Sequence, residues 1–77
     1  MIYLTKRDGT KNMARFYALD LQPALFGEWA LVKEWGRIGS AGQRCRVFYD
    51  EKTEADAALG RELKRRCTRQ YVESGDL

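Results

Sequence analysis

Histidine is absent from this 77-residue chain and cysteine occurs only twice, and both shortages exclude common kinds of chemistry. Without histidine, the protein cannot use His-based acid–base catalysis or a His-ligated metal. Cys45 and Cys67 are too few for a four-ligand zinc site and form no Cys-x-x-Cys pair. A disulfide between them is conceivable, but we expect reduced core thiols, each on the apolar side of its element. We therefore predict no catalytic residues, no metal and no cofactor.

Long apolar runs are also missing. No segment approaches the roughly 20 apolar residues of a membrane-spanning helix. Residues 1–7 lack the apolar stretch and cleavage site of a secretory signal, and no glycine-rich phosphate-binding loop of the Walker or dinucleotide type occurs. We expect a cytoplasmic protein without a membrane segment.

The chain does have apolar content and unevenly placed positive charge. Hydrophobic residues make up 44% of it and nine residues are aromatic, enough for the small core of a single domain over residues 1–77. The net charge is only +3, but the cations gather in two segments. In residues 33–46 they are opposed by Glu34 alone, and in residues 61–69 by Glu62 alone. Two basic clusters favour an anionic partner such as nucleic acid.

Alternating apolar residues and turn signals predict antiparallel strands. The strands are expected at residues 2–7, 14–21, 28–38 and 43–50. Asp8-Gly9 ends the first strand, and Gln22-Pro23 interrupts the second because proline cannot donate to a ladder. The last two strands are joined by a hairpin loop, Gly39-Ser-Ala-Gly42, whose glycines supply positive φ.

From Thr53 onward the apolar period changes to that of a helix. Thr53-Glu-Ala-Asp56 matches a capping box, and the helix is predicted from about residue 54 to 71, with Gly75 beyond it as a stop. Its apolar side is expected to contain Ala55, Ala58, Leu59, Leu63, Cys67 and Tyr71. The predicted fold class is α+β, an antiparallel sheet of about four strands with one long C-terminal amphipathic helix packed on one face. The other face is left to solvent or a partner.

The motif Trp35-Gly36-Arg37 lies near the end of the third predicted strand. Alternation places Trp35 on the same strand face as Lys33 and Arg37, while Gly36 faces the other way. An indole offers a stacking surface, and a guanidinium is a forked donor for phosphate or carboxylate. Trp35 could equally be core, but its cationic neighbours need water or an anion, so we expect its face to be partly open. Gly36 indicates either a β-bulge or room for a ligand.

The other cations have alternative interpretations. Arg44 and Arg46 share a face of the fourth predicted strand, where they could bind phosphate or protect a sheet edge from aggregation. For Arg37, an ion pair with Glu34 or Asp50 is the alternative to a phosphate contact. The cations of the predicted helix are Arg61, Lys64, Arg65, Arg66 and Arg69. They complement the helix dipole, which favours a structural role over a phosphate contact.

Taken together, these features resemble the WGR domain. The resemblance rests on Trp35-Gly36-Arg37-Ile38-Gly39, on Gly42-Gln43, on the basic strand and amphipathic helix that follow, and on the paired aromatics and alternating leucines of residues 16–21. It extends from about residue 3 to residue 72. WGR domains occur in DNA-damage-responsive poly(ADP-ribose) polymerases and in short or fused bacterial proteins. In the polymerases the domain helps to bind DNA breaks.

The resemblance implies that Trp35 packs on a terminal nucleotide, that Lys33 holds the adjacent phosphate backbone, and that Arg37 is the motif arginine, which in the polymerases also joins neighbouring domains. It implies no ADP-ribosyl transfer, because the chain contains no polymerase domain. We predict a non-catalytic nucleic-acid-binding module, with DNA ends or unpaired segments favoured. Its predicted contact residues are Trp35, Gly36, Arg37, Lys33, Arg44 and Arg46. The alternative is a protein–protein interaction module that uses the open sheet face or forms a homodimer.

Overall fold

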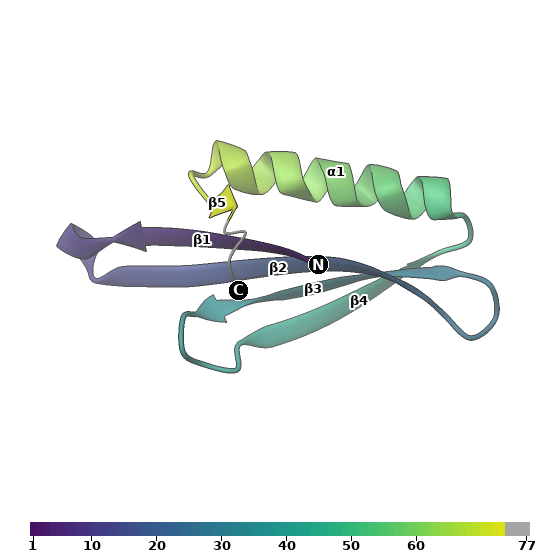
Figure 1. Cartoon of the computed structure of the whole chain (residues 1–77), viewed down its shortest axis with the longest axis horizontal. Helices are drawn as coiled ribbons and strands as arrows, with labels where there is room; N and C mark the ends of the chain where they lie inside the picture. The colour runs from purple at the N-terminus through teal and green to yellow at the C-terminus, as the bar shows by residue number, and fades with distance from the viewer. Residues whose placement is uncertain (74–77) are drawn as a thin grey trace.

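The computed structural model describes residues 1–73, in which five strands form one antiparallel sheet and a helix lies across one of its faces (Figure 1). The strands are β1 (Ile2–Asp8), β2 (Met13–Pro23), β3 (Trp29–Arg37), β4 (Gln43–Tyr49) and β5 (Val72–Glu73). The helix α1 (Lys52–Thr68) follows β4, and a short 3-10 helix, η1 (Gly9–Lys11), joins β1 to β2. The sheet order is β4-β3-β2-β1-β5. The predicted α+β class is confirmed, and β5 is a strand that the sequence pattern missed.

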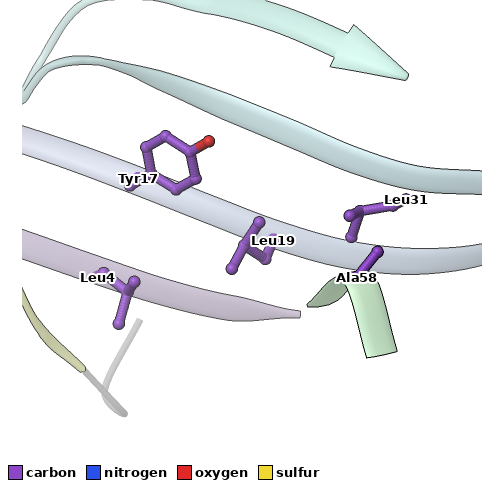
Figure 2. Close-up of a cluster of buried hydrophobic side chains, with 5 residues drawn as sticks. All are labelled: Leu4, Tyr17, Leu19, Leu31 and Ala58. Atoms are coloured by element: carbon purple, nitrogen blue, oxygen red, sulfur yellow. The ribbon is translucent and has the colours of Figure 1, made fainter. Parts of the chain in front are cut away.

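The core is a layer of side chains between the sheet and α1. In the register of the sheet, Leu4 of β1 is the partner of Tyr17 of β2, so both point to the same face. Leu19 lies two residues further along β2, and Leu31 of β3 and Ala58 of α1 complete the cluster (Figure 2). Each of these side chains is at most 6% exposed. The helix α1 packs on this face of the sheet. The strand residues between the core positions point to the opposite face, because side chains alternate along a strand.

The helix α1 begins earlier than the sequence pattern predicted. Its N-cap is Glu51, whose N–H donates a hydrogen bond of 3.2 Å to the side chain of Glu54. The capping interaction therefore starts two residues before Thr53, because a glutamate takes the place that the pattern assigned to threonine.

The helix also ends earlier than predicted, at Thr68. Gln70 adopts a left-handed φ of 70°. Its N–H and that of the following residue donate to the carbonyl oxygens of Cys67 and Arg66, each at 3.0 Å. This arrangement is a Schellman motif with glutamine in the position where glycine is usual. Because the prediction relied on a glycine to end the helix, it placed the end of α1 too late in the chain. The predicted stop at Gly75 lies outside the described residues.

The inward side of α1 differs from the predicted one in its second half. Ala55 and Ala58 are buried, as expected. Cys67 is exposed and Cys45 is half-buried, and both are free thiols, so the prediction of a core thiol is wrong for Cys67. The buried position of the next turn is Glu62, because residues 55, 58 and 62 share one side of a helix with 3.6 residues per turn. The partly buried residues that pack against the core from this part of the chain are Leu59, Leu63 and Tyr71.

The strand β2 extends beyond its predicted end at residue 21. The strand β2 continues to Pro23, which occupies its last position, where the missing N–H of proline is tolerated. The loop is closed by a hydrogen bond of 2.8 Å from the Ala24 N–H to the Glu28 carbonyl. At its tip the side chains of Leu25 and Phe26 are 93% and 89% exposed.

Gly36 marks a close approach of two backbone segments, and the bulge interpretation is wrong. Gly36 pairs with Phe16 in an unbroken register between β2 and β3. A Cβ atom at Gly36 would lie 2.7 Å from the Cα atom of Gly42. Gly42 has a φ of 71° and lies directly against the carbonyl group of Trp35. The hairpin between β3 and β4 therefore folds back tightly over the end of β3.

We expect Gly42→Ala to destabilise the protein more than Gly39→Ala. Both residues have positive φ, 71° and 93°, a conformation that costs a non-glycine residue roughly 1–2 kcal/mol. Only at Gly42 would the new methyl group also collide with the Trp35 carbonyl, adding about 1–3 kcal/mol. Urea denaturation of the two variants measures the difference, and equal losses would contradict the close packing of this hairpin.

Candidate nucleic-acid interface

A basic hollow opens on the helix side of the sheet, between the end of β3, the start of β2 and the C-terminal half of α1. Its volume is about 710 Å³. The cations that line this basic hollow are Lys11, Arg15, Lys33, Arg37, Arg65 and Arg66. A single carboxylate, that of Glu62, is among the described lining residues. The excess of positive charge suits an anionic ligand.

The pleat of β3 turns its motif side chains toward the hollow. Lys33, Trp35 and Arg37 alternate onto the face of the sheet that α1 covers. Trp35 packs against the core, and its ring is stacked with that of Tyr17, with 5.9 Å between centroids and 19° between planes. The indole is nevertheless only half-buried and forms part of the wall of the hollow. The expectation of a partly open Trp35 is therefore met, although its face is the one that carries the helix.

Two arginines occupy opposite positions on neighbouring strands beside Trp35. Arg15 of β2 is the register partner of Arg37 of β3, and like charges in opposite positions are destabilising. The Arg37 Nη1 atom donates to the Asn12 carbonyl at 3.3 Å. Within residues 1–73, neither arginine forms an ion pair, and the same is true of Lys11 and Lys33. The carboxylate pairing considered for Arg37 is absent, and a bound anion would relieve the repulsion.

On the helix side of the hollow, the carboxylate of Glu62 contacts three donor side chains. Its Oε1 atom accepts hydrogen bonds from the Tyr17 hydroxyl at 2.7 Å and from Arg66 Nη2 at 3.1 Å. Its Oε2 atom lies 3.6 Å from Arg65 Nη1. The guanidinium carbon of Arg66 lies 4.0 Å from the centroid of the Tyr17 ring, a cation–π contact. A buried carboxylate, a buried phenol and two arginines therefore form one network.

The network keeps Glu62 ionised and Tyr17 protonated. Burial opposes ionisation of Glu62, but the hydrogen bonds from Tyr17 and Arg66 and the nearby charges of Lys33 and Arg65 outweigh it and lower the pKa of this carboxyl. Burial, reinforced by the hydrogen bond to Glu62, raises the pKa of Tyr17 from 10.0 to about 12. At neutral pH the helix wall of the hollow therefore contains one fixed negative charge.

Comparison with known proteins identifies the family. The family model for the WGR domain matches residues 1–77. The chain belongs to the WGR domain family. A curated relative, the uncharacterized protein y4dW of Sinorhizobium fredii (strain NBRC 101917 / NGR234), is 39% identical over 54 residues, which are 70% of this chain and 26% of the relative. The matched part thus spans about a quarter of that relative. No solved structure matches the chain.

The motif of this WGR domain lies at the basic hollow. Of the predicted contact residues, the structure brings together Lys33, Trp35, Gly36 and Arg37. Gly36 contributes through its backbone, because its side-chain position points away toward Gly42. Four of the residues proposed from the sequence therefore share one surface.

Arg44 and Arg46 lie on the opposite face of the sheet. They are the register partners of Glu34 and Val32, which alternate away from the hollow. The Arg44 Nε atom lies 3.6 Å from the Glu34 carboxylate, and Arg46 lines a separate, more apolar hollow beside Phe48. The sequence pattern did not determine where Arg44 and Arg46 lie relative to Trp35, and the six predicted residues do not form one surface.

Sequence reasoning missed four cations of the hollow as members of the site. They are Lys11, Arg15, Arg65 and Arg66. Arg15 shares the period-two face of Tyr17, which was a usable signal. Arg65 and Arg66 were recognised only as complements of the helix dipole, because their distance to Trp35 depends on how α1 crosses the sheet.

Within residues 1–73, the WGR domain has no group of three or more cysteine, aspartate or glutamate side chains that could hold a metal ion. In the same part of the chain, no helix has both the length and the apolar character needed to cross a bilayer.

The raised pKa of Tyr17 predicts a pH range in which the WGR domain loses stability. Because the folded pKa of about 12 exceeds the ordinary value of 10.0, the stabilisation is complete below pH 10 and is lost as the pH rises to about 12. The loss is on the order of 2 kcal/mol. Urea denaturation at several pH values should show a smaller alkaline loss for Tyr17→Phe than for the wild type. Tyr3→Phe, on the other face, is the control and should behave as the wild type does.

Proposed function

We propose that this WGR domain binds nucleic acid, with DNA ends or unpaired segments preferred, and catalyses no reaction. One observation carries the proposal: the half-buried indole of Trp35 lines the same hollow as four cations without an ion-pair partner in residues 1–73. Those cations are Lys11, Arg15, Lys33 and Arg37. Family membership supports the proposal, because WGR domains are generally nucleic-acid-binding modules in poly(ADP-ribose) polymerases. A cytoplasmic location is part of the proposal and rests on the sequence.

The mechanism combines stacking with phosphate neutralisation. Inside a continuous duplex both faces of each base are covered by neighbouring bases, so an indole can stack only on an end or an unpaired segment. The guanidinium groups of Arg15 and Arg37 would hold a phosphate between them, which removes their mutual repulsion. We assign no base readout to α1, because the proposed stacking residue and phosphate-binding cations lie on the strands and on η1. Preference for nucleic-acid structure, not base sequence, follows.

We expect Trp35→Ala to weaken binding to a short blunt-ended duplex by about 1–3 kcal/mol, the usual value of an aromatic stack. Arg37→Ala should weaken binding and reduce the slope of log K against log salt concentration by about 0.9. Fluorescence anisotropy of labelled DNA over a range of salt concentrations measures both effects. Circular dichroism at the same temperature verifies that the variants are folded, since Trp35 also packs against the core.

Arg46→Ala is the matched control, because it removes the same charge from the opposite face of the sheet. Its affinity and salt slope should equal those of the wild type. If Arg46→Ala weakened binding as much as Arg37→Ala, the interface would not be confined to the basic hollow. Absence of binding at low salt would reject the nucleic-acid function.

An exposed apolar patch favours a second function, self-association. Leu25 and Phe26 at the β2–β3 loop are 93% and 89% exposed, and Phe48 of β4 is 56% exposed. They line a hollow of about 420 Å³ together with Glu28 and Arg46. Exposed apolar patches with a polar rim commonly mark interaction sites. We propose a second copy of the chain as the partner, because a two-fold arrangement can face Arg46 of one copy with Glu28 of the other.

Phe26→Asp should abolish self-association, which analytical ultracentrifugation measures as the change in mass with concentration. Arg46→Glu should also weaken it, by placing like charges opposite each other, and the double variant with Glu28→Arg should restore it. A wild type that stays monomeric at the highest concentrations, or a Phe26→Asp variant that still dimerises, would exclude this surface as a dimer interface.

A further inference from the structure

Glu62 is an unusual residue for a surface that would bind an anion. It is 7% exposed and lines the basic hollow, and both of its carboxylate oxygens face donors of the protein. Tyr17 and Arg66 donate to Oε1 at 2.7 and 3.1 Å, and Arg65 lies 3.6 Å from Oε2. A negative charge in this place opposes phosphate binding on its own side of the hollow. Its strongest effect is on the two arginines that contact it, with a weaker one on nearby Lys33.

Arg66 is turned inward by these contacts. Its side chain is 19% exposed, its guanidinium lies over the Tyr17 ring, and its Nε atom is buried without a hydrogen-bond partner among the described residues. Arg65 is 57% exposed but is drawn toward the other oxygen of Glu62. The carboxylate and the two guanidinium groups together have a net charge of only +1. The single negative charge of Glu62 partly neutralises both arginines.

We propose that Glu62 is an internal counter-ion that withholds Arg65 and Arg66 from phosphate contacts, so that the cations of the strands and of η1 take the phosphates. This inference rests on the proposed nucleic-acid function. A second set of phosphate-binding cations on the helix wall would compete with the strand side and allow the ligand to bind without contacting Trp35. Glu62 is thus a positioning residue that directs phosphates to the side where the indole lies.

The test is the salt dependence of DNA binding. Glu62→Gln keeps the shape of the side chain and an acceptor for Tyr17, but it releases the two arginines. We expect its slope of log K against log salt concentration to become steeper by about 0.9 to 1.8, which corresponds to one or two additional phosphate contacts. In the wild-type background, Arg65→Gln should leave the slope unchanged. In the Glu62→Gln background, Arg65→Gln should make the salt dependence less steep by about 0.9.

The outcomes separate this inference from the proposed function. If the wild type fails to bind DNA at low salt, the function itself is rejected. If the wild type binds and Glu62→Gln has the wild-type slope, only the counter-ion role is rejected. If Glu62→Gln does not fold, Arg65→Gln in the wild-type background decides the question, because a slope lower by about 0.9 would mean that Arg65 already contacts phosphate. Lys33→Ala, which removes a strand cation, should lower the slope by that amount and serves as the positive control.

Discussion

A hydrogen bond of 2.7 Å from the Tyr17 hydroxyl to Glu62 connects the middle of the sheet to α1, and both the core and the basic hollow depend on it. On the sheet side, Tyr17 belongs to the core cluster and stacks with Trp35. On the helix side, Glu62 holds Arg66 over the same ring. A buried carboxylate is costly unless it is hydrogen-bonded and paired, so α1 can lie over this part of the sheet only with these partners in place. The contact that anchors the helix also shapes the wall of the candidate site.

The two faces of the sheet have different chemistry because strand side chains alternate in direction. The face under α1 contains the core and, at one end, the basic hollow. On the other face, Tyr3 and Phe16 are stacked with 5.6 Å between centroids, and Phe48 lies exposed near the β2–β3 loop. A charged surface and an apolar one are therefore separated by the thickness of a single sheet. The two proposed contacts would therefore use separate surfaces.

Four cations of the hollow have no ion-pair partner in residues 1–73, and an anionic ligand bound to them would link binding to stability. Arg15 and Arg37 are register partners on β2 and β3, so their charged side chains start from neighbouring backbone positions and like charges there are destabilising. A ligand that neutralises them binds the folded state and not the unfolded chain, and it therefore stabilises the fold. The close contact of Gly36 with Gly42 fixes the end of β3, where Arg37 and Trp35 are presented, and so limits the freedom of the same residues.

Local pattern was sufficient for the elements and for part of the site. The alternation of β3 predicted that Lys33, Trp35 and Arg37 share a face, since a strand has a side-chain period of two. The capping and apolar signals predicted α1 with small errors at its ends, because Glu51 and Gln70 perform roles that other residues usually fill.

Relations between elements were decided by the tertiary structure. The register of β2 and β3 places Arg15 opposite Arg37, and the crossing of α1 buries Glu62 against Tyr17 and brings Arg65 to the hollow. The pairing of β4 sends Arg44 and Arg46 to the other face. A sequence period determines which residues of one element share a side, but the side that a helix covers depends on packing between segments distant in the chain.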